Sequence, residues 1–385
     1  MIHDAPTTST AVLEAVETLA PRIAGRAAEI EAARRLPTDL LDDLKRAGVF
    51  RLLLPASHGG IEADVTAFAR VFETLARADA SVAWTAMLGA AAWRDVVGLP
   101  RATFDGLFAS GPDVIGAGVI NPTGSIEPVD GGYLVTGRWS FASGCEHADW
   151  LFGDCFEGVV DGVPQLRIAL FAPDQVVIED TWDVSGMRGT GSHHFHVDGV
   201  VVPAERTLSV LDESSCVDAT IIHVPQLALY SCAVATVAIG IAQGALDDIL
   251  ELAVNKVPLL AGAALASSPT FHMELATAVA ELSAARALLY ETGEAMWEAA
   301  STGREPSMAE RARIRAGAVW MTARAAHVVD TAYRAGGGSS LYSSCPLQRR
   351  LRDVHAVTQH FLVRQDTLAT AGAILAGNDV DVMVF

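Results

Sequence analysis

Hydrophobic positions recur along the chain with two different periods, and the changes of period divide it into three regions. From Thr10 to Ala109 the residues Ala, Leu and Val recur every three or four positions, which predicts helices. From Val114 to about Val202 the period becomes two, which predicts strands. Beyond Pro203 the helical spacing returns. We therefore expect an α+β protein with an N-terminal helical domain (1–113), a central β domain (114–207) and a C-terminal four-helix bundle (208–385).

The central region contains short β-rich runs separated by Gly, Pro and Asp turns, which predicts a compact antiparallel barrel or sandwich. Asp130-Gly131-Gly132 joins two alternating runs, Ile126–Val129 and Tyr133–Phe141, and this pattern is typical of a hairpin. The main runs are Val114–Ile120, Tyr133–Phe141, Trp150–Phe156, Leu166–Phe171 and Phe195–Val202.

The second strand of this hairpin is rich in aromatic residues. Because side chains alternate between the two faces of a strand, we expect Trp139, Phe141 and Ser143 to share one side. They would form a flat apolar wall that ends in a hydroxyl group. Such a wall suits a planar heteroaromatic ring, and it is equally typical of a strand that packs its aromatic residues into a core.

Two features of the first region concern its later helices. Asp64 and Asp79 precede periodic apolar runs and are expected N-caps. The bulky side chains of Trp84, Met87 and Trp93 follow the second of them. They could roof a pocket, or they could simply fill the core.

Four long helical segments are predicted in the last region: Val224–Val254, Thr270–Ser301, Met308–Ala335 and Pro346–Ala376. On the last of them, Asp353, Val357, His360 and Arg364 share one face, and His355 and Gln359 form another pair. A histidine of ordinary pKa suits proton transfer near neutral pH, although a histidine on a helix is more often a solvated residue.

A glycine run, Gly336-Gly337-Gly338, ends the third of these segments. It could receive a phosphate or a neighbouring chain, or it could be a plain C-cap and loop. Ala219–Leu246 is long enough to cross a bilayer, and it contains no charged residue unless His223 is protonated. Because it contains Pro225 and many small and polar residues, we interpret it as a helix buried on all sides, against another subunit.

The net charge of −19 argues against nucleic acid or anionic membrane as a partner. Five scattered cysteines without a CxxC pair indicate reduced thiols of a cytoplasmic protein, and Met1–Ala11 lacks the pattern of a secretion signal.

Trp182–Ser192 is a Gly-rich loop whose backbone amides could approach a ligand, with hydroxyls from Thr190 and Ser192. Of the histidines that follow, only His194 and His196 share a face, so we expect no metal site.

The chain lacks a phosphate-binding GxxxxGK[ST] loop, an HExxH motif, a GxSxG elbow and a strand-linked GxGxxG fingerprint. Any electrons for a redox reaction would therefore have to come from another protein.

Three segments carry a resemblance to a known family: "GRWSFASGCEHADW" (137–150), "WDVSGMRGTGSHHFHVDGVVVPAER" (182–206) and "PLQRRLRDVHAVTQH" (346–360). Together with the order of the three regions, they resemble the acyl-CoA dehydrogenase fold and, within it, the oxygenase components of two-component flavin monooxygenases.

This resemblance implies roles for particular residues. Trp139, Phe141 and Ser143 would line the flavin, with Ser143 near its reactive N5/C4a edge, and Thr190 and Ser192 would contact the ring or its side chain. Gly337 and Gly338 would also contact the cofactor. His360 matches the catalytic histidine of the family, and Trp84, Met87, Trp93 and His355 would line the substrate pocket. Dehydrogenases of this fold use a glutamate base, and its absence here favours oxygenation over desaturation by a tightly bound FAD.

The implied reaction uses reduced FMN or FAD (FMNH2 or FADH2) and O2. A separate NAD(P)H-dependent flavin reductase would supply the reduced flavin, which would form a C4a-(hydro)peroxide and hydroxylate a small aromatic or polyketide-like substrate. The resemblance also implies a homotetramer. Related oxygenases often carry a histidine where this chain has Ala91, so the substrate is expected to be anchored differently from a simple phenol.

Overall fold

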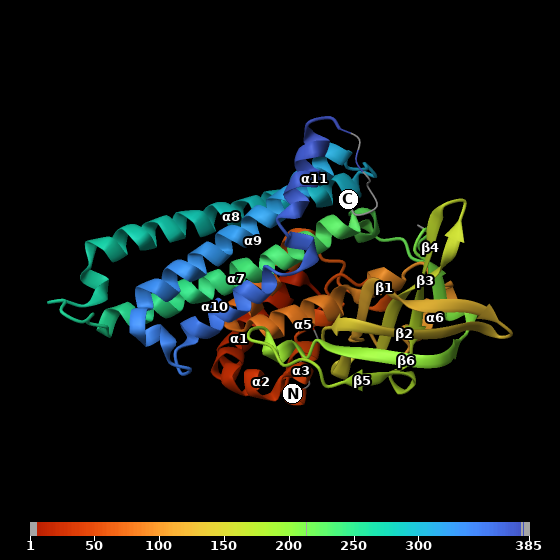
Figure 1. The fold of residues 1–385 in the computed structure, drawn as a ribbon, viewed down its shortest axis with the longest axis horizontal. Helices are drawn as coiled ribbons and strands as arrows, with labels where there is room; N and C mark the ends of the chain where they lie inside the picture. The colour runs from red at the N-terminus through yellow and green to blue at the C-terminus, as the bar shows by residue number, and fades with distance from the viewer. Residues whose placement is uncertain (1–5, 213, 379, 381–385) are drawn as a thin grey trace.

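The computed structural model describes residues 6–212, 214–378 and 380, and it has helices, a sheet and helices again in the predicted order (Figure 1). The α+β fold class is therefore confirmed. The first region contains α1 (Ser9–Gly25), α2 (Ala27–Ala33), α3 (Thr38–Arg46), α4 (Val65–Ala78), α5 (Ala80–Ala91) and α6 (Arg101–Leu107). A short 3-10 helix, η3 (Ala92–Val96), directly continues α5.

Both predicted N-caps are confirmed. The carboxylate of Asp64 accepts a hydrogen bond from the backbone N–H of Ala67 at 2.7 Å, and that of Asp79 accepts one from Val82 at 3.0 Å. Each bond satisfies an amide that has no partner within its own helix. These caps determine where α4 and α5 begin, and α5 carries residues of the candidate site.

The central sheet has seven strands in the order β5-β6-β2-β1-β3-β4-β7. The predicted hairpin is confirmed, since β1 pairs antiparallel with β2 and Ile126 lies opposite Val135. The sheet is not wholly antiparallel, however, because β1 and β3 run parallel. The chain reverses a second time after β2 and returns on the other side of β1. The strands are β1 (Gly116–Val129), β2 (Gly132–Ala142), β3 (Trp150–Val160), β4 (Val163–Phe171), β5 (Val177–Glu179), β6 (His193–Val202) and β7 (Thr207–Ser209).

The two faces of β3 pack into different cores. Leu151 and Cys155 join Trp139 in a core on one side of the sheet. Trp150 and Phe152 join the large core of the helical regions on the other side. Since side chains alternate along a strand, the even-numbered residues of β3 face the N-terminal helices.

The C-terminal helices are α7 (Gln226–Asn255), α8 (Pro269–Ser301), α9 (Met308–Gly336), α10 (Pro346–Val357) and α11 (Asp366–Leu375). They form the elongated bundle in Figure 1. The prediction of one helix from Pro346 to Ala376 is wrong, because α10 ends at Val357 and η11 (Phe361–Val363) separates it from α11. His360 therefore lies in extended backbone after α10, where its side chain caps η11, and not on a helical face with Asp353 and Arg364.

The long apolar helix α7 is the central element of the bundle. Its length and composition would allow it to cross a membrane, but 83% of its most apolar window is buried inside the chain. It packs on α4, α8, α9 and α10 of the same chain. The predicted burial of this helix is therefore confirmed and is largely provided by its own chain, whereas its contact with another subunit stays a prediction.

Candidate active site

Three parts of the chain that are far apart in sequence meet at the hydroxyl group of Ser143. The indole N–H of Trp84 on α5 donates a hydrogen bond to Ser143 Oγ at 3.0 Å. Ser143 Oγ lies 2.7 Å from Ser192 Oγ, which lies 2.7 Å from Thr190 Oγ1. The end of β2, helix α5 and the Gly-rich loop thus form one hydrogen-bonded group.

His360 completes this group from the C-terminal region. Its ring packs edge-on against Trp84, with 5.3 Å between ring centroids. Burial lowers the pKa of His360 to about 4, so the ring is neutral at neutral pH. Its Nδ1 accepts the N–H of Leu362 at 3.4 Å, which leaves the ring proton on Nε2. His360 therefore offers a reacting group its Nε2–H as a hydrogen-bond donor, and Nδ1 can act as a base only if it releases the N–H of Leu362.

The Gly-rich loop is held in place by α10. Asp353 Oδ1 accepts a hydrogen bond from the backbone N–H of Met187 at 2.6 Å. A Cβ atom on Gly186 would lie 2.1 Å from the carbonyl oxygen of Arg352, so only glycine permits this close approach. Trp182 donates from its indole nitrogen to the carbonyl of Met187 at 3.0 Å. Helix α10 thus positions the hydroxyl groups of Thr190 and Ser192.

The prediction that Trp139 and Phe141 share one side of β2 is wrong. The pairing of β2 with β6 shifts register between Trp139 and Ala142, and Phe141 has a φ of 70°. This bulge turns the two rings to opposite sides. Trp139 is fully buried, stacks on Phe195 and donates to the carbonyl of Asp154 at 2.8 Å.

Phe141 instead lies at the surface beside the hydroxyl group of Ser143. Phe141 is 69% exposed although its side chain is a large apolar ring. The rings of Trp182 and His194 each form an edge-to-face pair with it, with 6.1 Å between ring centroids. A strained backbone that presents an exposed aromatic ring is a common feature of ligand sites. An isoalloxazine ring needs an apolar face and hydrogen-bonding groups at its edge, and Phe141 with Ser143 offers both. The residues at this position therefore fit a flavin.

The remaining predicted pocket residues are dispersed. Met87 is buried in the helical core, and Trp93 packs edge-on against Phe104. His355 is half exposed on α10 and pairs with Asp330 at 2.8 Å. Of the predicted roof, only Trp84 contacts the group around Ser143.

Gly337 and Gly338 lie at the junction of α9 and η10 (Gly337–Leu341), near Lys256, which donates to Ser339 at 2.8 Å. Helix α10 separates them from His360. This helix has 12 residues and therefore rises about 18 Å. One copy of the chain does not bring these glycines to Ser143.

Sequence reasoning missed the roles of three residues that shape the site. Asp353 was placed only on a helical face, and Trp182 was noted only as the start of a loop. Their roles depend on contacts between α10 and the loop, which no local pattern encodes. His193 was considered only as a metal ligand, yet its Nδ1 accepts the backbone N–H groups of Thr181 and Trp182 at 3.1 and 3.2 Å and so shapes the same loop.

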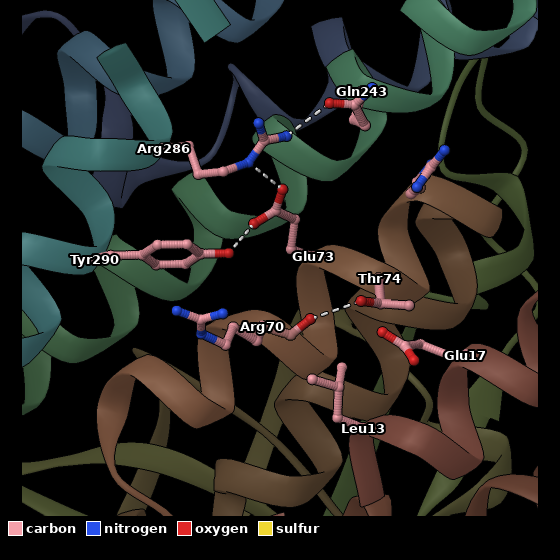
Figure 2. Close-up of a pocket in the computed structure, with 9 residues that line it drawn as sticks. Leu13, Glu17, Arg70, Glu73, Thr74, Gln243, Arg286 and Tyr290 are labelled. Carbon is pink, nitrogen blue, oxygen red and sulfur yellow. Dashed lines mark hydrogen bonds and ion pairs between the residues drawn. The ribbon is translucent and has the colours of Figure 1, made fainter. Parts of the chain in front are cut away.

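A separate hollow of about 310 Å³ lies between α1, α4, α7 and α8. Figure 2 shows Glu73 between Arg286 and Tyr290, with which it forms hydrogen bonds of 2.6 and 2.5 Å. Gln243 accepts a second bond from Arg286 at 2.8 Å. Because these polar groups satisfy one another and none of the predicted site residues lines the hollow, we do not assign it to the reaction.

Comparison with known families gives two matches. Residues 8–95 match the N-terminal domain of acyl-CoA dehydrogenase, and residues 232–365 match its C-terminal domain. Together these matches cover more than half of the chain, including Trp84, Asp353 and His360.

Individual relatives are flavin-dependent oxygenases. The chain is 33% identical to indole-3-acetate monooxygenase of Acinetobacter baumannii over 91% of this chain and 90% of that protein. It is 31% identical to the oxygenase subunit HsaA of a flavin-dependent monooxygenase of Rhodococcus jostii, over 90% of this chain and 93% of that protein. The solved structure of XiaF from Streptomyces sp. with FADH2 and glycerol superimposes with a TM-score of 0.90 at 26% identity, covering 96% of each chain.

Proposed function

The chain belongs to the acyl-CoA dehydrogenase family and is the oxygenase component of a flavin-dependent monooxygenase that uses reduced flavin, and from this we propose that the group around Ser143 is its active centre. The observation that carries the proposal is the convergence of Trp84, Ser143 and His360 beside the exposed ring of Phe141. When bound, the reduced flavin supplies the electrons that activate O2, and one oxygen atom is transferred to the substrate.

The residues of this chain would bind the flavin, orient the substrate and shield the reacting atoms from water. Phe141 would cover part of one face of the flavin, and Ser143 would hydrogen-bond its edge. His360 would donate a hydrogen bond from Nε2 to the substrate, and it would accept a proton only after Nδ1 releases the N–H of Leu362. The indole of Trp84 and the surrounding apolar helix α5 would exclude water from the reacting atoms.

We infer that the substrate is a small aromatic molecule. Helix α5 is largely apolar and presents the indole ring of Trp84 to the group around Ser143, and the named relatives include an indole-3-acetate monooxygenase. Indole-3-acetate is therefore a rational first probe. Hydroxylation of this probe, or of a phenolic or polyketide-like compound, would identify the substrate.

An oxygenase component implies a separate flavin reductase as partner. We propose that this reductase uses NAD(P)H, because the chain carries none of the nucleotide-binding motifs sought in its sequence. We also propose a homotetramer, as the family resemblance implies. The free cysteines, Cys145, Cys155, Cys216, Cys232 and Cys345, support a cytoplasmic location.

The test is rapid mixing of the protein and reduced flavin with oxygen, in the presence and absence of the aromatic probe. We expect oxygen consumption coupled to formation of a hydroxylated product. His360→Ala should slow product formation more than oxygen uptake, so that hydrogen peroxide accumulates. If an acyl-CoA thioester instead bleaches tightly bound oxidised flavin, the protein is a dehydrogenase and the proposal fails.

A further inference from the structure

Four buried polar atoms near the end of α5 have no hydrogen-bond partner among the described residues. They are Trp93 Nε1 and Arg94 Nη1 on η3, and Trp150 Nε1 and Asp154 Oδ1 on β3. None of the four residues is more than 7% exposed. Leaving a buried polar group unpaired costs about 1–3 kcal/mol, and native proteins leave few such groups. The unpaired donors on η3 and on Trp150, which packs against η3, indicate that a molecule outside the chain pairs with them.

The two elements that carry these atoms face each other. Trp150 and Asp154 lie on the face of β3 that packs against the helical regions. A Cβ atom on Gly116 would lie 2.5 Å from the ring of Trp150 and 2.8 Å from Ala92, so η3 and Trp150 meet at the same point. Asp95 on η3 also contributes to raising the pKa of Asp154, although burial is the larger cause.

Arg94 carries the positive charge of this cluster. Its Nη2 donates to the carbonyl oxygen of Val224 at 2.8 Å, while Nη1 has no partner. Among the residues that the structure describes, Arg94 forms no ion pair within 4 Å of a carboxylate. A buried guanidinium with a free donor and no paired carboxylate favours an anionic ligand.

The neighbouring carboxyl groups do little to neutralise Arg94. Asp95 accepts hydrogen bonds from Gln226 at 2.6 Å and from Tyr230 at 2.8 Å. Burial raises the pKa of Asp95 to about 7 and that of Asp154 to about 8. At neutral pH Asp154 is therefore mostly protonated, and Asp95, whose charge interacts with that of Arg94, is only partly ionised, so Arg94 is incompletely neutralised.

One continuous helical segment links the cluster to the active centre. Trp84 and Arg94 are ten residues apart on α5 and its continuation η3, which corresponds to about 16 Å between their backbone positions, and the side chains span part of this distance. Thr85 Oγ1, another buried atom without a partner, lies between them in sequence, and its side chain contacts Gly144 beside Ser143. Unpaired polar groups thus extend from the active centre toward Arg94.

We propose that Arg94 binds the carboxylate of an aromatic substrate, with the aromatic ring directed toward Ser143 and His360. This rests on the proposed function and makes the substrate class more specific: an aromatic acid. The indole N–H groups of Trp93 and Trp150, on the adjoining surfaces of η3 and β3, are further unpaired donors for the anion. The negative charge of the substrate then fixes which end of the molecule meets the flavin.

The experiment compares two ligands that differ only in charge. Binding of indole-3-acetate and of indole-3-acetamide is measured by titration calorimetry with saturating oxidised flavin, so that no turnover is required. We expect the acid to bind at least tenfold more tightly than the amide. Arg94→Met should weaken acid binding by about tenfold to a hundredfold and leave amide binding within about twofold, as loss of a charge-assisted hydrogen bond predicts.

Two further variants keep the result interpretable. Arg94→Lys retains a cation and a donor for Val224, so it should fold and keep part of the preference for the acid even if Arg94→Met is unstable. Arg51→Met removes another largely buried guanidinium, which is paired with Asp113, and should not change the preference. If wild type binds acid and amide equally, or if the Arg94 variants weaken both equally, Arg94 only clamps the Val224 carbonyl and the inference is wrong. Oxygen-coupled hydroxylation of a neutral aromatic in that case would leave the proposed function intact.

Discussion

The hydroxyl protons beside Ser143 all point in one direction. Trp84 donates to Ser143, and Thr190 donates to the carbonyl of Met187 at 2.9 Å. The proton of Thr190 is therefore in use, so Thr190 accepts from Ser192, and Ser192 in turn accepts from Ser143. Ser143 keeps a lone pair for a ligand but has no free proton. The N5 atom of reduced flavin carries a proton, whereas that of oxidised flavin is an acceptor, so this arrangement favours the reduced cofactor.

Ser192→Ala tests this orientation. Without Ser192 the proton of Ser143 is free to bond oxidised N5, so we expect the preference for reduced over oxidised flavin to fall by about tenfold, the value of one ordinary hydrogen bond. The measurement is the reduction potential of the bound flavin against that of free flavin. Ser140→Ala, which changes a serine of β2 outside the hydrogen-bonded group, serves as the control. An unchanged potential in Ser192→Ala would contradict the assigned proton direction.

The buried ring of His360 gives a prediction for pH and stability. An unfolded histidine takes up a proton below about pH 6.5, whereas the folded His360 does so only near pH 4. The unfolded state therefore binds more protons between these values, and the free energy of unfolding should fall by about 1–3 kcal/mol as the pH falls from 6.5 to 4. His360→Gln should remove this part of the slope in chemical unfolding measured at several pH values. If His355→Gln, on the exposed side of α10, flattens the curve equally, burial of His360 is not the cause.

Between elements, the contact of α10 with the Gly-rich loop determines where the hydroxyl groups lie. Gly186→Ala would place a Cβ atom 2.1 Å from the Arg352 carbonyl and force the loop away from α10. We expect a loss of about 1–3 kcal/mol in unfolding free energy and weaker flavin binding, because the loop also carries Thr190 and Ser192. Thermal unfolding and flavin titration measure the two effects.

The control is Gly106→Ala on α6, where an added Cβ atom meets open space. This change should be neutral or slightly stabilising, since alanine is the better helix former. Equal losses in both variants would show that the close approach of Gly186 to α10 is not responsible.

Local signals in the sequence predicted the elements that depend on neighbouring residues. The caps at Asp64 and Asp79 and the hairpin at Asp130-Gly131-Gly132 are such cases, because their geometry is formed within a few residues. The bulge at Phe141 and the end of α10 before His360 were not predicted. The first depends on the register with β6, and the second on the capping of η11.

In the candidate site, too, residues with an evident chemical use were predicted, and features that depend on distant contacts were not. Trp84, Ser143, Thr190, Ser192 and His360 carry polar or aromatic groups of obvious chemical use, and the structure brings them together. Strict alternation placed Trp139 on one side with Phe141 and Ser143, but the backbone bulges at Phe141 and Trp139 is fully buried in the core. The contact of Asp353 with the loop and the proposed role of Arg94 were missed because the partners of both residues lie in other regions of the chain.

For the whole molecule, the open question is whether one copy of the chain forms a complete site. Gly337 and Gly338 were predicted to contact the cofactor, and α10 keeps them far from His360 in the same chain. They can serve the cofactor only if a second copy brings them to the Ser143 group. In a symmetric assembly each site would then combine residues of two chains.

Mixed assemblies test this arrangement. Gly338→Glu should fold, because a side chain at Gly338 meets open space, and its charge should repel a flavin phosphate. His360→Ala should remove most product formation in its own site, while oxygen uptake continues as uncoupled peroxide release. If sites are shared between copies, co-expressed Gly338→Glu and His360→Ala chains form about a quarter of sites with both residues intact, since random pairing makes half of all dimers mixed and each mixed dimer has one intact site.

We therefore expect product formation near a quarter of the wild-type rate from the co-expressed pair, and almost none from either variant alone. Chains purified separately and mixed without exchange provide the background, and Gly338→Ala should retain full activity. Native mass measurements confirm that mixed assemblies are present. If those assemblies form and remain inactive, Gly338 does not contribute to the site of a second copy. The prediction that Gly338 contacts the cofactor is then wrong.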